Sequence, residues 1–137
     1  MSDLFTTEDL QKVVQSGPYP VEAYAFVQDG LSHTAQQLHA ETAHGWELDR
    51  HVTGQELCMG LRDLAIQRYG MLARTVLSCW SIHETIDIGK IVYTMIDAGL
   101  LRQQAEDSIS DFTDVYDFRE AFDLRGMESL IGASKDA

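Results

Sequence analysis

The spacing of apolar residues predicts two helices in the first third of the chain. Between Pro20 and Leu38, apolar side chains recur about every 3.6 residues, as they do on one face of a helix. Gly30 is expected to weaken this helix at its middle. A shorter helix precedes it, beginning at Thr6 or Thr7 and ending at Gly17-Pro18, because proline cannot continue a helix.

Three further helices are predicted in the middle of the chain. The clearest start signal is the capping box Thr53-Gly54-Gln55-Glu56, in which a hydroxyl and a carboxylate each satisfy a free backbone amide. This helix is expected to run to Gly70. A helix over Met71–Trp80 follows, and the side chain of Met71 is expected to face the core. After a short turn, another helix is predicted over residues 86–98.

The pattern changes after Gly99. The run Val115-Tyr116-Asp117-Phe118 alternates with a period of two, which indicates a short strand. Two helices, a tight turn and then a ribbon form the order of elements in a winged helix-turn-helix; the alternative is an unrelated helical hairpin with a small ribbon. The predicted fold class is therefore mainly α, with about five helices and a C-terminal winged-helix-like unit, made of a helix-turn-helix plus a short β ribbon.

Length and composition favour a single domain. The chain has 137 residues, of which 45% are hydrophobic, and this suits one buried core. We expect one α-rich domain over residues 1–128 and a loose tail over residues 129–137.

The acidic N-terminus lacks a signal-peptide pattern, and no apolar run approaches the ~20 residues that span a bilayer. With two cysteines that suit a reducing compartment, we expect a cytoplasmic location and no membrane partner.

The charge of the chain argues against direct binding to nucleic acid. Asp and Glu number 22 against 10 Lys and Arg, which gives a net charge of −12. A helix that reads DNA needs basic or amide side chains near its start, and the corresponding stretch offers only Lys90. The carboxylates of the predicted wing would repel phosphate. A transcription regulator acting through the winged-helix unit remains the second alternative function.

An acidic stretch from Glu106 to Asp123 is the predicted partner-binding surface. Its simplest interpretation is a solvated face that helps solubility. The functional alternative is an electrostatic docking strip for a basic partner protein. Calcium binding is disfavoured because the stretch lacks the central glycine and distal glutamate of an EF-hand loop. The expected partner-binding residues are Glu106, Asp107, Asp111, Asp114 and Asp117.

A small-ligand pocket near the start of the third helix is the first alternative. His51 lies two residues before the capping Thr53, where free backbone amides form a natural anion site, or it packs over the helix start as a structural residue. A role of Glu56 in the cap weakens any role as a general base. The aromatic residues at the start of the second predicted helix, Tyr19, Tyr24 and Phe26, belong either to the core or to a partner surface. The candidate ligand-binding residues are Tyr19, Tyr24, His51, Gln55 and Glu56.

Motifs for catalysis and for cofactors are not found in the sequence. His39 and His44 are five residues apart, which does not place them on one helix face as a zinc pair requires. Cys58 and Cys79 have no neighbouring histidine in sequence, and no Gly-x-Ser-x-Gly, Walker or dinucleotide glycine pattern occurs. We therefore predict no catalytic residue, no metal site and no cofactor.

Four runs of the sequence are distinctive: Tyr19-Pro20-x-x-Ala23-Tyr24-x-Phe26-Val27, His51–Leu57, Asp87–Val92 and Asp111-Phe112-x-x-Val115-Tyr116-Asp117-Phe118. Together they resemble a family of small uncharacterised bacterial proteins, chiefly from the planctomycete and verrucomicrobial group. The resemblance covers roughly residues 5 to 122 and implies a stand-alone bacterial cytoplasmic domain, with no functional residues to carry over. The function predicted from the sequence is a non-enzymatic module for protein–protein interaction, of undetermined oligomeric state.

Overall fold

A computed structural model describes residues 7–15, 17–42, 52–103 and 107–123. Within these ranges the chain forms six α-helices and two short 3-10 helices, which confirms the prediction of a mainly α fold. The end of the predicted domain at residue 128 and the tail over 129–137 lie outside the described residues. In chain order the elements are α1 (Thr7–Val14), α2 (Val21–Thr42), α3 (Gly54–Tyr69), η1 (Gly70–Leu72), α4 (Ala73–Cys79), α5 (Thr85–Asp97), η2 (Ile109–Phe112) and α6 (Phe118–Ala121).

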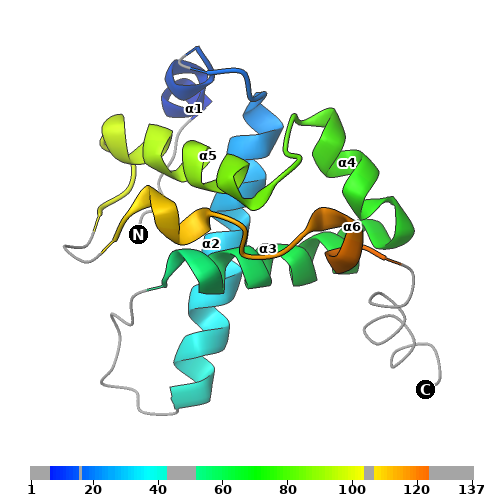
Figure 1. The fold of residues 1–137 in the computed structure, drawn as a ribbon. Coiled ribbons are helices and arrows are strands. Elements are labelled where there is room, and N and C mark those ends of the chain that lie inside the picture. The colour runs from blue at the N-terminus through cyan, green and yellow to red at the C-terminus, as the bar shows by residue number, and fades with distance from the viewer. Residues whose placement is uncertain (1–6, 16, 43–51, 104–106, 124–137) are drawn as a thin grey trace.

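Helix α2 runs through the middle of the molecule and contacts three other helices. Figure 1 shows α5 crossing α2 near its start and α3 crossing it farther along, while α1 packs beside its first turns. The side chains of Tyr24, Phe26 and Val27 are almost fully buried at these crossings. The aromatic residues of this helix therefore belong to the core, which decides between the two alternatives left open by the sequence.

Glycines allow α2 and α3 to approach each other closely. A Cβ atom at Gly30 would collide with the side chain of Leu61, and a Cβ atom at Gly60 would collide with the Oγ1 atom of Thr34. Gly30 therefore lies at the contact between the two helices, and α2 continues through it without interruption. The residue expected to weaken the helix is the one that lets α3 pack against it.

The helix starts follow local hydrogen bonds, one of which the sequence predicts. At α3 the backbone N–H of Thr53 donates to the Glu56 carboxylate at 3.0 Å, and the N–H of Glu56 donates to the Thr53 hydroxyl at 3.1 Å. The capping box is thus confirmed.

The prediction that Met71 faces the core is wrong, because this side chain is 67% exposed. The chain forms the separate turn η1 at this corner, so that α4 begins at Ala73 instead.

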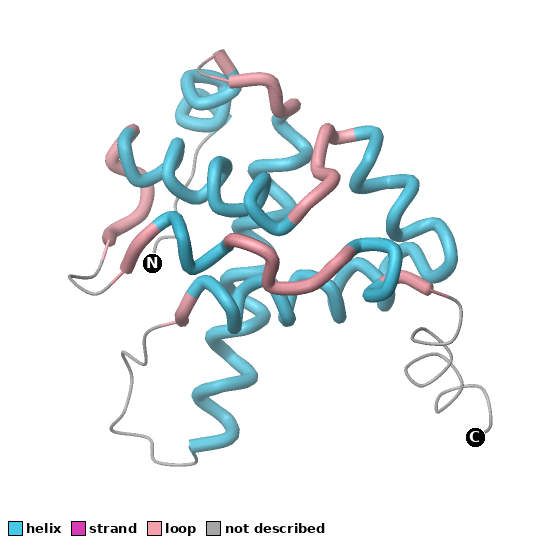
Figure 2. Tube along the Cα trace, viewed as in Figure 1, coloured by secondary structure: helices cyan, strands magenta, loops and turns pink. Residues whose placement is uncertain are grey.

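The predicted β ribbon is wrong, and with it the winged-helix-like unit. The structure contains no strand anywhere in the ranges it describes, and the described residues after α5 form η2, α6 and the loops and turns beside them. Figure 2 shows the segment between η2 and α6 as a loop that crosses α3. The backbone is extended at Thr113 (ψ 123°) and at Asp117 (ψ 130°), but Asp114 between them has a left-handed φ of 50°, so the segment turns and does not continue as a strand.

Side chains, and not a neighbouring strand, hold this segment in place. The hydroxyl of the buried Thr85 donates to the carbonyl oxygen of Phe112 at 2.6 Å and accepts from the N–H of Val115 at 3.1 Å. The ring of Phe112 packs where Gly54 and Gly89 leave space, since a Cβ atom at either glycine would lie within 3.1 Å of that residue. These contacts join η2 to the starts of α3 and α5.

Candidate functional site

The two tyrosines of the predicted ligand pocket lie in the core. Tyr19 is 5% exposed and Tyr24 is fully buried, and their rings meet edge to face with centroids 6.4 Å apart. The Tyr19 hydroxyl donates to the Oδ1 atom of Asp87 at 2.7 Å. Burial, and then this hydrogen bond, raise the pKa of Tyr19 above its ordinary value. Tyr19 therefore connects the start of α2 to the start of α5.

The remaining predicted ligand residues are separated from these tyrosines. Gln55 and Glu56 line a shallow cavity of about 280 Å³ between α2 and α3, whose other lining residues do not include Tyr19 or Tyr24. The Glu56 carboxylate also accepts the capping hydrogen bond from Thr53. His51 lies outside the described residues. The structure thus divides the predicted pocket between two places.

Two of the predicted partner-binding carboxylates act as local caps. Asp111 accepts a hydrogen bond from the N–H of Ser108 at 3.1 Å, and Asp117 accepts one from the N–H of Arg119 at 2.7 Å. Asp114 is exposed and has a left-handed φ of 50°, a conformation that non-glycine residues other than Asn and Asp rarely adopt. Asp107 is partly buried, and Glu106 lies outside the described residues.

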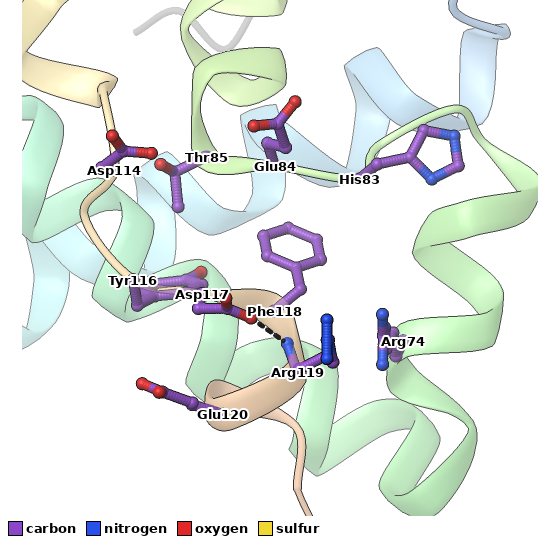
Figure 3. Close-up of a pocket in the computed structure, with 10 residues that line it drawn as sticks. All are labelled: Arg74, His83, Glu84, Thr85, Asp114, Tyr116, Asp117, Phe118, Arg119 and Glu120. Atoms are coloured by element: carbon purple, nitrogen blue, oxygen red, sulfur yellow. Dashed lines mark hydrogen bonds between the residues drawn. The ribbon is translucent and has the colours of Figure 1, made fainter.

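A second cavity lies between the α4–α5 loop and the last segment of the fold. It has a volume of about 510 Å³, within the range of roughly 300–1,000 Å³ that is usual for binding sites. Figure 3 shows the side chains around it. The lining residues are Arg74, His83, Glu84, Thr85, Asp114, Tyr116, Asp117, Phe118, Arg119 and Glu120.

The floor of this cavity is aromatic and rigid. Phe118 is 5% exposed and stacks on Tyr116 with ring centroids 5.8 Å apart, and Phe122 packs edge to face on Phe118. The Tyr116 hydroxyl donates to the carbonyl oxygen of Cys58 at 2.8 Å, which fixes the ring against α3. Burial raises the pKa of Tyr116 above its ordinary value of 10.0.

The walls of the cavity carry opposite charges. In Figure 3, Arg74, Arg119 and His83 lie on one side of the Phe118 ring, while Asp114 and Glu120 lie on the other. Within the part of the chain that the structure describes, neither arginine forms an ion pair, although the whole chain carries a net charge of −12. The cavity therefore offers two cationic groups that are available to an external anion.

Sequence reasoning missed this basic wall. Arg74 comes from α4 and Arg119 from α6, 45 positions later by their numbers, and His83 lies in the loop before α5. No spacing rule links residues so far apart in the chain. The only sequence signal was that Arg119 is the single basic residue within the acidic stretch from Glu106 to Asp123.

Reactive groups are held in their neutral forms. The described side chains with a shifted pKa are four tyrosines and Cys58, and burial is the largest cause of an increase in each. The pKa of the Cys58 thiol rises to about 12, which removes its nucleophilic thiolate at neutral pH. In the described ranges, no three His, Cys, Asp or Glu residues are grouped to hold a metal ion.

No family model, curated protein or solved structure matches this chain. The family resemblance stated from four sequence runs therefore remains a prediction.

Among the helices in the described ranges, none combines the length and the hydrophobicity needed to cross a membrane.

Proposed function

We propose that this protein is a non-enzymatic module that binds a charged segment of another protein in the cavity between the α4–α5 loop and α6. The observation that carries the proposal is the pair of exposed arginines, Arg74 and Arg119, which form no ion pair with any described residue of this acidic chain. Exposed cations facing a carboxylate wall provide the electrostatic complementarity that specifies a partner.

The character of the lining favours a polypeptide over a metabolite. Most of the lining side chains are exposed and charged, and only Thr85 and Phe118 are buried. Small-molecule sites are predominantly apolar and enclose most of their ligand, whereas protein interfaces have an aromatic centre and a polar, solvated rim. Tyrosine and arginine are also the residues that contribute most to such interfaces.

The proposal modifies the docking surface expected from the sequence. Asp114 and Asp117 line the cavity, so part of the acidic stretch contributes to it. These carboxylates face Arg74 and Arg119 across the same cavity, so the complementary partner carries both charges and is not simply basic. We place this interaction in the cytoplasm, because Cys58 and Cys79 are both unpaired thiols.

Retention of peptides by the immobilised protein tests the proposal. A random octapeptide library is passed over the protein and retained peptides are identified by mass spectrometry, with one half of the library carrying a free C-terminal carboxylate and the other an amide. We expect retention to disappear in Arg119→Glu, which reverses the charge of an exposed cavity residue. Arg102→Glu is the matched control, because Arg102 is exposed and does not line the cavity.

Two outcomes contradict the proposal. The first is that the protein retains peptides from neither half of the library at low salt, where electrostatic attraction is least screened. The other is retention that falls equally in Arg119→Glu and Arg102→Glu, because the loss would then follow from net charge and not from the cavity. Circular dichroism of both variants establishes that each is folded.

A further inference from the structure

We infer that the basic wall of this cavity binds the free C-terminal carboxylate of the partner polypeptide; the inference rests on the proposed function. A carboxylate is a planar anion with two equivalent oxygens, and a guanidinium group presents its N–H donors in a matching fork. Arg74 and Arg119 supply two such forks, and His83 supplies a ring nitrogen at the same side of the cavity.

The opposite wall favours a carboxylate over a more highly charged anion. Glu84, Asp114, Asp117 and Glu120 line the same cavity. A phosphate group carries nearly two negative charges at neutral pH, and each of these carboxylates repels it. A C-terminus carries one charge, and a basic side chain a few residues before it can meet the acidic wall. The cavity thus suits a chain end with a lysine or arginine close to the terminus.

The backbone around the basic wall is held before any ligand binds. The N–H of His83 donates to the Oδ2 atom of Asp87 at 2.9 Å, and that carboxylate is also fixed by the Tyr19 hydroxyl. The N–H of Arg119 donates to Asp117 at 2.7 Å at the start of α6. Preorganised backbone lowers the entropy lost when a ligand is bound.

The floor of the cavity is closed by packed residues whose polar groups are already bonded. Phe118 and Tyr116 are stacked, and Figure 3 shows the Phe118 ring between the basic wall and Asp114. Thr85, which lines the same cavity, is 1% exposed and uses its hydroxyl in hydrogen bonds to Phe112 and Val115. Phe118 is itself 5% exposed, so the ligand contacts mainly the charged walls.

Nuclear magnetic resonance of the arginine side-chain Nε–H groups tests the inference. The probe is the peptide acetyl-Lys-Gly-Gly with a free carboxylate, compared with the same peptide amidated at its C-terminus and with inorganic phosphate. We expect the acid peptide to shift the signals of Arg74 and Arg119, and the amide to bind about tenfold or more weakly, because charge-assisted hydrogen bonds are lost. Arg74→Gln and Arg119→Gln should each weaken binding of the acid peptide, and Arg102→Gln should not.

Each contrary result overturns the carboxylate inference. Equal affinity for the acid and the amide shows that the terminus is not recognised. Phosphate that binds more tightly than the acid peptide identifies a phosphate site instead. An acid peptide that leaves the signals of Arg74 and Arg119 unshifted also overturns the inference. In all three cases the proposed function is decided separately by the octapeptide library, because retention of its amidated half supports a peptide site without carboxylate recognition.

Discussion

Cys58, which is buried, and Tyr116, which is partly buried, form a pair that connects α3 to the last segment of the fold. The phenolic hydroxyl donates to the Cys58 carbonyl oxygen at 2.8 Å, while the Cys58 side chain is completely buried. Burial raises the pKa of both side chains, because the interior solvates the thiolate and the phenolate poorly. The neutral forms of both groups are therefore favoured in the folded protein.

The two cysteines should react very differently with an alkylating reagent. Cys58 is buried and its pKa is raised to about 12, whereas Cys79 is exposed. Iodoacetamide at pH 8 should modify Cys79 alone in the folded protein and both cysteines in urea, because the thiolate is the reacting species. Intact-mass and peptide mapping measure the modified positions. Rapid labelling of Cys58 in native Cys79→Ser protein would show that α3 is not packed as described.

Replacing Tyr116 by phenylalanine should reduce stability at neutral pH and flatten its dependence on alkaline pH. The raised pKa of Tyr116 means that the folded state keeps the proton, while the unfolded chain releases it above the ordinary value of 10.0. The stabilising contribution of the Tyr116 proton is therefore fully present below pH 10 and is lost as the pH rises beyond this value. Tyr116→Phe lacks this loss but loses a hydrogen bond worth about 1 kcal/mol.

Urea unfolding of the wild-type protein and of Tyr116→Phe at pH 7, 9 and about 11 measures both effects. We expect the difference in unfolding free energy between the two proteins to shrink as the pH rises. A constant difference over this range would mean that the folded state does not hold the Tyr116 proton.

At the scale of elements, glycine positions decide how closely the helices pack. Gly30 and Gly60 face Leu61 and Thr34 where α2 crosses α3, and Gly89 faces Phe112 where η2 lies on α5. Glycine lowers the stability of an isolated helix, but it also lets two backbones approach. In this molecule the close approach brings α3 near enough to α2 for the core to form.

Gly60→Ala should destabilise the protein despite the higher helix propensity of alanine. The new methyl group would occupy the position of the Thr34 hydroxyl, and overpacking of this kind costs about 1–3 kcal/mol. The gain in helix propensity is only about 1 kcal/mol. Gly17→Ala is the control, because its Cβ atom would meet only the Tyr24 hydroxyl at 3.6 Å, an ordinary contact. Chemical denaturation that ranks Gly60→Ala at or above the wild type would contradict the close packing.

The last segment of the fold is an element without a regular partner. Thr85, Phe112 and Tyr116 hold it through two hydroxyl groups and one ring, and no strand lies beside it in the described ranges. The left-handed φ of 50° at Asp114 interrupts the extended backbone just before the alternating run begins. A run of four alternating residues records neither this turn nor contacts with distant side chains, which explains why it was wrongly interpreted as a β ribbon.

At the scale of the whole molecule, charge is distributed unevenly. The chain carries a net charge of −12, and yet Arg74 and Arg119 line one cavity without an ion pair among the described residues. Two other arginines form ion pairs, Arg62 with Asp63 in the same helix and Arg68 with Asp29 between α3 and α2. A net charge of this size destabilises the compact state by self-repulsion, while the local basic wall attracts anions.

Added salt should therefore raise stability and weaken peptide binding. Raising NaCl from about 0.01 M to about 0.1 M shortens the screening length from about 30 Å to about 10 Å. We expect the thermal midpoint to increase because repulsion among the carboxylates is screened. The increase should be smaller in Asp114→Asn/Glu120→Gln, which removes two exposed charges. Equal midpoint increases in both proteins, or a decrease in either, would contradict this account.

The local features of this protein could be predicted from its sequence because they depend on near neighbours. The capping box at Thr53 and Glu56 is confirmed, since its two groups lie one helical turn apart. The helix predicted over residues 86–98 lies within one residue of α5 at each end. The exposure of Met71 could not be predicted, because it depends on the direction in which the chain turns between α3 and α4.

The sequence by itself determined a helical, acidic chain with a core, because helix periodicity and composition are properties of short windows. Only the tertiary structure decided that Tyr19 belongs to the core and that Gln55 lies elsewhere. It alone brought Arg74 and Arg119 together, because contacts between distant residues depend on how helices cross. Those crossings depend on how the side chains at each contact pack, as Gly60 packs against Thr34, and the order of residue types along the chain does not show this packing.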